Sequence, residues 1–495
     1  MQKPFYITTT LPYVNAPLHM GHALEFVRAD TIARYKKLAG FDVYFNTGTD
    51  EHGKKNYDKA IEKGLSPQEF VDQGFETFKE QLKMFGVSDD IHFVRTTDKH
   101  HEMAAQEFWK KVSDNGYIYK KSYKAKYCVG CESEKTDSEL DERGECPLHP
   151  GRQLELIDEE NYFFKFSEFG DKLLEFYEKN PNFVVPEFRL HEMKNFIKNG
   201  LQDFSISRLK NKMSWGIEVP NDKDHVMYVW FDALVNYIST LGWPFASAQD
   251  LRPDKENLFE KYWVNGNPTQ YCGKDNTRFQ AVTWQAMLMA AGLPNSHQIV
   301  VNGFITGDKG VRMSKTIGNV VDPRDLVKEY GIDALRYFLL REVSSFEDSP
   351  FTLERFKEAY NSGLANGLGN LVSRIMTLSE KYLTPTQPPP YQGGGEGGGL
   401  PQEFVKFFEE FDIKKAMDYI WERIQNLDKK IQETEPFKVI KQDENKGKEM
   451  IKELVLELYQ IARMLNPVMP ETNEKLKALI RSNKKPEAPL FLRKE

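Results

Sequence analysis

The first fifty residues alternate between apolar segments and turn residues in a pattern that predicts strand, helix and strand. Residues 5–10 are β-branched and aromatic, and the prolines and asparagine that follow predict a turn. From His19 onward, apolar residues recur every three or four positions until Gly40, which indicates a helix. Residues 41–47 form a second expected strand. A β–α–β unit predicts a parallel sheet with ligand sites at the carboxyl ends of its strands.

A similar pattern returns in the second half of the chain. Residues 226–231 are continuously apolar and predict a buried strand, with Asp232 as the cap of the helix that follows. Residues 280–292 predict another helix and 298–301 another strand. From about residue 351 the pattern is helical, interrupted by the Gly- and Pro-rich segment 385–401. The predicted fold class is α/β, a doubly wound parallel-sheet (Rossmann-like) domain with an insertion, followed by a C-terminal α-helical bundle.

Composition narrows the class of protein. A length of 495 residues predicts about three domains. The 67 Lys and Arg against 74 Asp and Glu give a net charge of −7, which argues against wrapping nucleic acid over the whole surface but allows a local basic track. Hydrophobic content of 40% excludes a mostly disordered chain. No apolar run is long enough to span a membrane and no secretory signal begins the chain, so we expect a cytoplasmic protein.

Two polar motifs lie where a nucleotide could bind. His19, Gly21 and His22 open the first helix, where imidazole donors, a helix amino terminus and a small residue leave room for a triphosphate. The alternative is that one histidine caps the helix and the other is exposed. Much later, Arg312, Ser314 and Lys315 lie in a glycine-marked loop that could close over phosphates, or they form a solvated basic turn.

Three of the four cysteines are clustered, and a histidine lies three residues after the last of them. Cys128 and Cys131 form one knuckle, and Cys146 and His149 form a second. This spacing predicts a tetrahedral Zn²⁺ site with one ion per chain, in which four protein ligands fill the coordination shell. The zinc is therefore expected to be structural. Cys272 stands apart and is expected to be a small buried residue.

The two nucleotide motifs together carry a family resemblance. HMGH after the first strand and RMSKT after the last strand resemble the paired signatures of the class I aminoacyl-tRNA synthetases. The segments LPYVNAPLHMGH, TGTDEHG, YVWFDALVNYI and GKDNTRF closely resemble the methionyl-tRNA synthetases, and the resemblance covers essentially the whole chain. It implies an enzyme that activates L-methionine with ATP to methionyl-adenylate, releases pyrophosphate and transfers methionine to the 3′ end of its tRNA.

The resemblance also implies roles for individual residues. His19 and His22, with Gly21 leaving room for the ligand, would stabilise the charge that develops on the α-phosphate, and Arg208 would assist near the phosphates. Asp275 would contact the adenylate region, Lys315 would hold the leaving pyrophosphate, and Mg²⁺ would bind to the phosphates of ATP. The further ATP-binding residues would be Lys274, Arg312 and Ser314. Asp50 would receive the methionine ammonium group, and the pocket for its side chain would be lined by Leu11, Tyr13, Trp230, Ala233, Tyr237 and Gln280. In the bundle, Asn370, Arg374 and Phe437 would contact the anticodon, although an exposed helix face is the simpler interpretation of the first two.

Two positions depart from the family pattern. Gln280 stands where many members have a histidine, which puts that histidine's role in the pocket in question, although glutamine still donates and accepts hydrogen bonds. Arg312 replaces the first lysine of the second signature and keeps its charge. We expect methionine to remain the substrate.

The expected domain organisation follows from the same resemblance. It comprises a catalytic first half (1–113), an insertion (114–216) with the zinc knuckle at about 125–152 beside the tRNA acceptor end, a catalytic second half (217–306), a signature-loop and stem-contact region (307–350), and an anticodon-binding bundle (351–495). The expected partners are methionine, ATP and the initiator and elongator methionine tRNAs, with no membrane, and we expect a monomer.

Two other functions remain open from the residues alone. A metal-dependent hydrolase could use His19, His22, His52 and Asp50 around a catalytic ion, although it would leave RMSKT and the bundle without a purpose. A non-catalytic tRNA-binding relative is the second alternative, and the presence of both histidines and Lys315 weighs against it.

Overall fold

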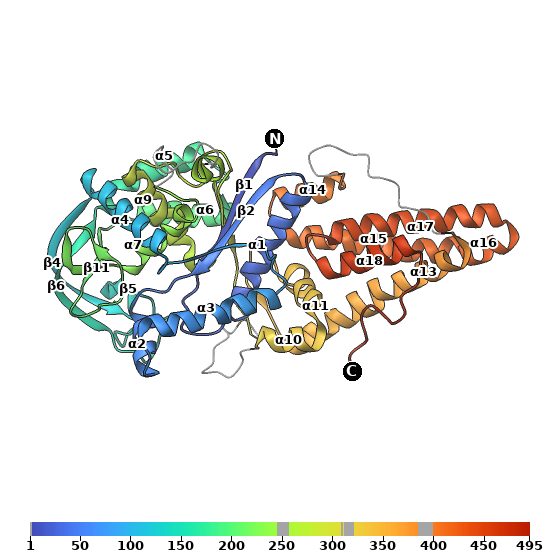
Figure 1. Cartoon of the computed structure of the whole chain (residues 1–495), viewed down its shortest axis with the longest axis horizontal. Coiled ribbons are helices and arrows are strands. Elements are labelled where there is room, and N and C mark those ends of the chain that lie inside the picture. The colour runs from blue at the N-terminus through green and yellow to red at the C-terminus, as the bar shows by residue number, and fades with distance from the viewer. Residues whose placement is uncertain (1, 245–256, 308–309, 311–320, 385–398) are drawn as a thin grey trace.

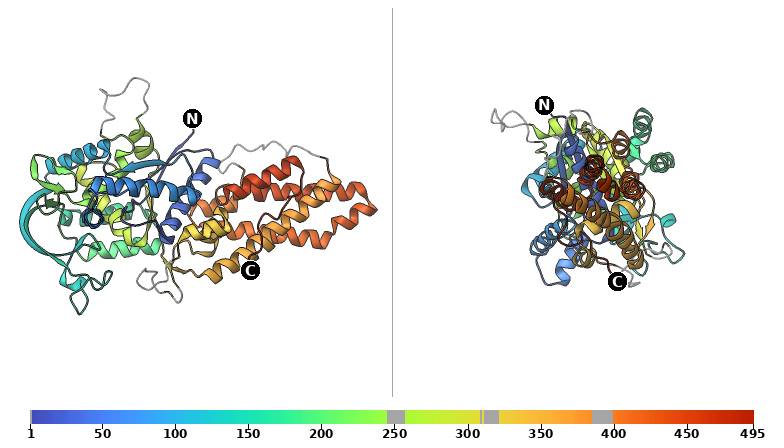
Figure 2. Two further views of the ribbon diagram at one scale, coloured as in Figure 1. Left: turned by 60° about the horizontal axis from the view of Figure 1, so that its bottom comes forward. Right: turned by 90° about the vertical axis from the view of Figure 1, so that its right-hand side faces the viewer.

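The computed structural model describes residues 2–244, 257–307, 310, 321–384 and 399–495. The predicted loop with Arg312, Ser314 and Lys315 lies outside the described residues, as does most of the Gly- and Pro-rich segment. The molecule is elongated, with a sheet-containing part at one end and a bundle of helices extending from it (Figures 1 and 2). In the described part of the chain, no helix is long and apolar enough to cross a membrane.

A six-stranded parallel sheet forms the centre of the first part. Its strand order is β3-β2-β1-β12-β13-β7, and every neighbouring pair is parallel. The strands are β1 (Pro4–Thr9), β2 (Asp42–Thr49), β3 (His92–Arg95), β7 (Val184–Val185), β12 (Thr269–Gly273) and β13 (Gln298–Asn302). The chain winds outward from β1 in both directions, which confirms the predicted doubly wound, Rossmann-like sheet. A crevice for a ligand is expected at the carboxyl ends of β1 and β12.

Helices pack against both faces of this sheet because consecutive residues of a strand point to opposite sides. Phe5 and Ile7 belong to one apolar cluster with residues of α1 and α3, whereas Tyr6 belongs to a second cluster with residues of α4 and α9. These helices are α1 (Met20–Leu38), α3 (Pro67–Met84), α4 (Lys99–Asp114) and α9 (Trp284–Ala291). The short helix α2 (Lys54–Glu62) follows β2 directly.

The insertion is built on an antiparallel sheet with the order β5-β4-β6-β8. Its elements are β4 (Ile118–Cys128), β5 (Ser133–Lys135), β6 (Glu155–Phe164), α5 (Gly170–Lys179), α6 (Glu187–Lys198) and β8 (Phe204–Ser205). The insertion is joined to the parallel sheet, because β7, the edge strand beside β13, comes from the same stretch of the chain.

The strand predicted over residues 226–231 is wrong in its second half. The strand β11 (Asp222–Met227) ends early and pairs antiparallel with β9 (Ser207–Leu209) and β10 (Glu218–Val219), outside the parallel sheet. The chain then forms α7 (Val229–Ala233) and α8 (Asn236–Ser239). Asp232 therefore lies inside a helix and does not cap one. Every residue of 226–231 except the half-buried Trp230 is buried, and a short, uniformly apolar run does not distinguish a strand from a buried helix.

The C-terminal part is helical, as predicted. The small parallel pair β14 (Ile305–Thr306) and β15 (Ser349–Pro350) contains the last two strands of the described residues, and the other elements that follow β14 are helices. They are α10 (Pro323–Tyr330), α11 (Ile332–Tyr337), α12 (Leu353–Ala359), α13 (Asn370–Tyr382), α14 (Gln402–Glu409), α15 (Ile413–Thr434), α16 (Pro436–Gln442), α17 (Glu444–Leu465) and α18 (Pro470–Ser482). The apolar cluster beneath one face of the parallel sheet continues into this bundle.

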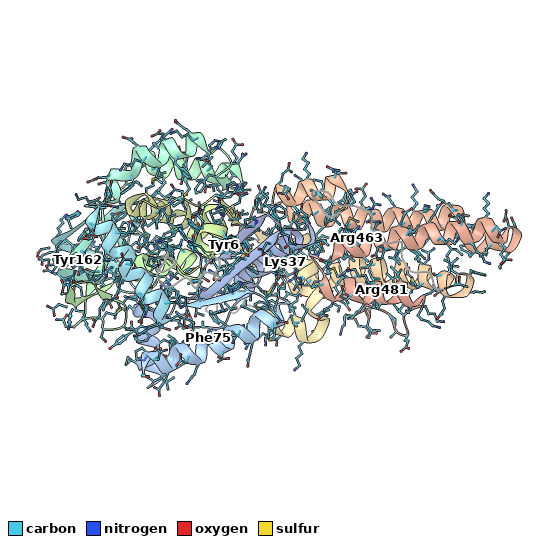
Figure 3. All side chains as sticks on the ribbon, turned by 45° about the horizontal axis from the view of Figure 1, so that its top comes forward. Tyr6, Lys37, Phe75, Tyr162, Arg463 and Arg481 are labelled. Atoms are coloured by element: carbon cyan, nitrogen blue, oxygen red, sulfur yellow. The ribbon has the colours of Figure 1, made fainter. Side chains whose placement is uncertain are left out.

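Helix α1 connects the sheet to the bundle. Lys36 Nζ lies 2.7 Å from a carboxylate oxygen of Glu409, and the hydroxyl of Tyr35 donates to the same carboxylate at 2.9 Å. Figure 3 shows Lys37, the next residue of α1, at this junction. Deeper in the junction, Arg336 of α11 is fully buried and lies 2.8 Å from Asp30 of α1. The Arg336 guanidinium also donates to backbone carbonyls of Gly86 and of the α17–α18 connection.

We expect Arg336→Ala to lower the free energy of unfolding by about 3–5 kcal/mol, because it leaves the Asp30 carboxylate buried without this partner. Chemical denaturation of the full chain measures this change. Arg324→Ala is the matched control, since Arg324 pairs with Asp322 at an exposed position where an ion pair contributes about 0–1 kcal/mol. Equal effects of the two substitutions would contradict the structural role given to Arg336.

Candidate active site

The two histidines of the first motif cap helix α1. The Nδ1 atom of His19 accepts from the backbone N–H of Gly21 at 3.1 Å, and the Nδ1 atom of His22 accepts from the backbone N–H of His19 at 3.3 Å. The rings stack with centroids 3.8 Å apart. Burial, and then the neighbouring His19 ring, hold the pKa of His22 well below its ordinary value. A β-carbon at Gly21 would lie 3.0 Å from the His19 ring, so glycine permits this close packing.

A buried glutamate joins the two strand ends at the crevice. Glu25 of α1 accepts from the backbone N–H and hydroxyl of Thr10, at 2.8 and 2.5 Å, and from the backbone N–H of Gly273 at 3.0 Å. Burial raises the pKa of this carboxyl to about 7. Sequence reasoning missed Glu25, and the signal available was an acidic residue among the apolar positions of α1.

Asp50 follows the end of β2, and its carboxylate is only partly satisfied. The residue is 3% exposed, and its Oδ1 atom has no hydrogen-bond partner among the described residues. Burial, followed by the charges of Asp232 and Glu132, raises the pKa of Asp50 well above its ordinary value. A buried carboxylate oxygen without a donor is costly, and a cationic ligand would relieve that cost.

Aromatic residues predicted for the pocket come from segments near Asp50. Tyr13 forms a β-bridge with Asp50 itself. The Trp230 ring on α7 stacks on Phe279 with centroids 3.6 Å apart, and Ala233 is buried one turn further on. The Tyr13 hydroxyl and the Trp230 indole N–H also lack hydrogen-bond partners in the described part of the chain. Leu11, half-buried, precedes Tyr13 by two residues.

Gln280 takes part in a buried hydrogen-bond chain with Tyr237. The Gln280 amide donates to the Tyr237 hydroxyl at 2.6 Å, and its oxygen accepts from Gln270 of β12 at 2.6 Å. Gln280 is 1% exposed and Tyr237 is 2% exposed. Both ends of the Gln280 amide therefore form hydrogen bonds, and one of them orients Tyr237, a predicted pocket residue.

Asp232 bridges two buried histidines. Its carboxylate lies 2.6 Å from Nδ1 of His52 and 2.8 Å from Nε2 of His101, whose other ring nitrogen lies 2.9 Å from the Ser239 hydroxyl. This network ties the loop after β2 to α4, α7 and α8. Because His52 faces Asp232, it does not join His19, His22 and Asp50 in a metal-binding group within the described residues. The geometry therefore gives no support to a catalytic metal at these four residues.

The remaining predicted nucleotide-binding residues lie on separate elements. Lys274 follows β12, and its ammonium lies 2.6 Å from Asp348 and 4.2 Å from the centroid of the Phe304 ring. Asp275 is the next residue and is exposed. Arg208 is on β9, where its guanidinium lies between the rings of Tyr127 and Tyr228 and donates to the Ser207 carbonyl at 2.7 Å.

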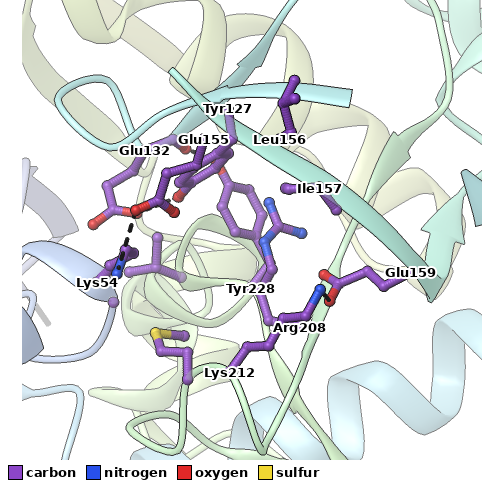
Figure 4. A pocket seen from close by; sticks show the side chains of 13 residues that line it. Lys54, Tyr127, Glu132, Glu155, Leu156, Ile157, Glu159, Arg208, Lys212 and Tyr228 are labelled. Atoms are coloured by element: carbon purple, nitrogen blue, oxygen red, sulfur yellow. Dashed lines mark hydrogen bonds and ion pairs between the residues drawn. The ribbon is translucent and has the colours of Figure 1, made fainter. Parts of the chain in front are cut away.

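Arg208 lines a cavity of about 110 Å³ between the insertion and the loop after β2 (Figure 4). Ion pairs between Lys212 and Glu159, at 3.1 Å, and between Lys54 and Glu155, at 3.5 Å, border the cavity. The structure places Arg208 in this cavity, and its contact with a phosphate stays a prediction.

The predicted metal ligands converge. The sulfur atoms of Cys128, Cys131 and Cys146 and a ring nitrogen of His149 all lie within 4.8 Å of one another. His149 Nδ1 is 3.4 to 3.9 Å from the three sulfurs, and the Cys131 and Cys146 sulfurs are 3.5 Å apart. Tetrahedral zinc with bonds of about 2.3 Å has ligand-to-ligand distances of about 3.8 Å. The donor set and the spacing therefore fit Zn²⁺.

The sequence and the fold both match known proteins. The family described as "tRNA synthetases class I (M)" matches residues 5–376. A methionine–tRNA ligase of Caldanaerobacter subterraneus subsp. tengcongensis is 42% identical over 96% of this chain and 74% of the relative, and one of Thermotoga maritima is 38% identical over 97% and 76%. The chain belongs to the methionyl-tRNA synthetase family. Its members are aminoacyl-tRNA synthetases, so this chain is an enzyme of that class.

A solved structure agrees with this assignment. Mycobacterium tuberculosis methionyl-tRNA synthetase in complex with methionyl-adenylate superposes with a TM-score of 0.87 at 35% identity, covering 97% of this chain and 94% of that chain. The free form of the Mycobacterium tuberculosis enzyme superposes with a TM-score of 0.81 at 31% identity over 100% and 99% of the two chains. The similarity includes the helical part as well as the sheet.

The residues predicted to contact the anticodon lie on the bundle, away from this crevice along the molecule (Figure 1). Asn370, at the start of α13, is exposed, and Arg374 one turn later forms an ion pair with Asp428 of α15. Phe437, on α16, is 38% exposed. Such exposure of a large ring suits stacking on a base, but Arg374 would have to share its charge between Asp428 and an RNA ligand.

The bridge between His52 and Asp232 predicts a pH-dependent contribution to stability. Burial alone lowers the pKa of His52, but attraction to Asp232 more than offsets this and leaves the pKa raised. The imidazolium therefore stabilises the fold fully below about pH 6.5, and this contribution is lost as the pH rises through the raised pKa.

We expect His52→Gln to lower the free energy of unfolding by about 3–5 kcal/mol at about pH 6 and by less at about pH 9, as measured by urea denaturation. His191→Gln, at an exposed position on α6, serves as the control and should have little effect at either pH. A loss for His52→Gln that does not change with pH would show that no charge is involved.

Proposed function

We propose that the chain catalyses two steps at the crevice between β1 and β12. In the first, the methionine carboxylate attacks the α-phosphorus of ATP, forming methionyl-adenylate and releasing pyrophosphate. In the second, the terminal ribose hydroxyl of methionine tRNA attacks the adenylate carbonyl and AMP leaves. The observation that carries the proposal is the buried Asp50 carboxylate, which has an unpartnered oxygen and forms a β-bridge with Tyr13. A buried carboxylate fits an ammonium group, and a neighbouring aromatic ring suits a thioether.

The pocket residues divide the recognition of methionine between charge and shape. Asp50 binds the ammonium group, which replaces the missing donor at Oδ1. Leu11, Tyr13, Trp230, Ala233 and Tyr237 surround the side chain, where aromatic edges suit a polarizable sulfur. Gln280 acts through Tyr237, whose hydroxyl it holds. The methionyl group stays linked to AMP as methionyl-adenylate until the tRNA arrives, so no covalent enzyme intermediate forms.

The histidines at the start of α1 act on the phosphates. Attack at the α-phosphorus places charge on its equatorial oxygens, and His19 and His22 donate to them at a helix amino terminus, where negative charge is favoured. Gly21 keeps the backbone close to the ligand. Lys315, with Arg312 and Ser314, holds the leaving pyrophosphate, and Lys274, Asp275 and Arg208 position the nucleotide. Mg²⁺ accompanies ATP and neutralises its phosphates.

The cysteine–histidine cluster would hold one structural Zn²⁺ per chain through Cys128, Cys131, Cys146 and His149, and no reaction step passes through it. The knuckle would support the tRNA acceptor end, and Asn370, Arg374 and Phe437 would contact the anticodon of initiator and elongator methionine tRNAs. The protein would act as a monomer in the cytoplasm. The domains would be 1–113 and 217–306 for catalysis, 114–216 for the insertion, 307–350 for the signature loop and 351–495 for the anticodon.

Asp50→Asn tests the ammonium site. We expect it to raise the KM for methionine in ATP–pyrophosphate exchange by about 30-fold or more, because a charged hydrogen bond is lost, with little change in the KM for ATP. Asp114→Asn, an exposed carboxylate at the end of α4, is the control. An unchanged methionine KM in Asp50→Asn would exclude Asp50 as the ammonium ligand.

Gln280→Ala tests the departure from the family pattern. It removes the donor to the buried Tyr237 hydroxyl and the acceptor for Gln270, so we expect methionine affinity measured by calorimetry to fall about tenfold. Gln68→Ala, at an exposed position on α3, should bind methionine like the wild type. Wild-type affinity in Gln280→Ala would show that this side chain is not part of the pocket.

A further inference from the structure

Glu132 has an unusual position directly after Cys131 in the cysteine–histidine cluster. It is 1% exposed, and its backbone adopts a left-handed conformation with φ 48°. A residue with a β-carbon is rarely held there unless its surroundings determine the conformation. On the other side of Cys131, a β-carbon at Gly130 would lie 2.4 Å from the His149 ring. The backbone on both sides of Cys131 is therefore tightly fixed.

The Glu132 side chain leaves the knuckle and caps a helix in the catalytic part. One carboxylate oxygen accepts from the backbone N–H of Lys55 at 2.8 Å, and the other accepts from the Tyr127 hydroxyl. Lys55 is the second residue of α2, and Gly53, which precedes α2, has no side chain to cap it. The first N–H groups of a helix need acceptors, and a carboxylate there is favoured by the helix dipole. Glu132 supplies from the insertion the cap that α2 lacks.

The Glu132 backbone also contacts the segment that carries Trp230. Its carbonyl accepts from the Tyr228 hydroxyl, and Tyr228 directly precedes α7, which carries Trp230 and Ala233. The loop after β2 approaches both Val229 of α7 and Glu132 at Gly53, where a β-carbon would lie 3.3 Å from Val229 and 3.4 Å from the Glu132 carboxylate. One residue of the knuckle thus contacts both the loop that carries Asp50 and the segment that carries Trp230.

We propose that Glu132 is a positioning residue that couples metal occupancy of the cysteine–histidine cluster to the binding of methionine at Asp50. This inference rests on the proposed function. The metal fixes Cys131 through its sulfur, Cys131 fixes the backbone of Glu132, and Glu132 fixes the start of α2 and the start of α7. Without the metal, Glu132 is no longer fixed in the position from which it caps α2. The distance between the Asp50 loop and the Trp230 segment is then no longer fixed either. Binding linkage then requires methionine to tighten metal binding by the same factor as the metal tightens methionine binding.

The test measures both affinities on the full-length zinc-loaded protein. Zinc affinity is obtained by equilibrium competition with a chromogenic chelator, with and without saturating methionine, and methionine affinity is obtained by calorimetry. In the wild type we expect methionine to tighten zinc binding at least about fivefold. In Glu132→Ala we expect this factor to fall to nearly one, together with weaker methionine binding.

Two further variants separate coupling from a loss of folding. Glu132→Gln keeps an oxygen that accepts from the Lys55 N–H, so it should retain most of the coupling. Glu155→Gln removes a different carboxylate of the same cavity, one that pairs with Lys54, and should couple like the wild type. The inference is overturned if Glu132→Ala keeps the wild-type coupling factor, or if the wild type binds both ligands without coupling. A wild type that binds no methionine would instead overturn the proposed function.

Discussion

The proposed amino-acid site is organised around a carboxylate that is already buried without a ligand. Asp50 lies at the end of β2 with one oxygen unpartnered, and its pKa is raised by burial and then by the charges of two further carboxylates, those of Asp232 and Glu132. Such a cluster of buried carboxylates is unfavourable unless each has hydrogen-bond or ion-pair partners. The rings of His52 and His101 are hydrogen-bonded to Asp232, and the backbone N–H of Lys55 and the hydroxyl of Tyr127 donate to Glu132. Of these three carboxylates, only that of Asp50 has a buried oxygen without a hydrogen-bond partner among the described residues, and under the proposed function the substrate ammonium group would supply that partner.

The same residues explain why distant segments must fold together. The carboxyl ends of β1 and β12 are tied by Glu25, the insertion is tied to α2 by Glu132, and the bundle is tied to α1 by the buried pair of Asp30 and Arg336. Each connection is a charged or hydrogen-bonded group buried between elements, where breaking one partner is costly. The nucleotide crevice, the knuckle and the bundle therefore share one framework, and a change in one part can alter the others.

The sequence predicted the parallel sheet, the helical bundle and the cysteine–histidine cluster because each depends on local patterns: strand–helix periodicity, loss of strand signals and ligand spacing. It mispredicted residues 228–231 because a short, uniformly apolar segment has no hydrophobic periodicity that separates a strand from a helix. The bridge from Asp232 to two histidines, the cap that Glu132 gives to α2 and the link made by Glu25 could not be predicted, since each joins residues that only the tertiary fold brings together. Roles carried over from the family, such as that of Arg208, stay predictions because geometry alone does not show what these residues bind.

Amino-acid-dependent ATP–pyrophosphate exchange by the wild-type protein, measured separately with each of the standard amino acids, tests the central claim most directly. The account predicts exchange with methionine and far slower exchange with every other amino acid, because only methionine combines an ammonium group for Asp50 with a thioether for the aromatic pocket. Faster exchange with another amino acid, or none with methionine, would contradict it.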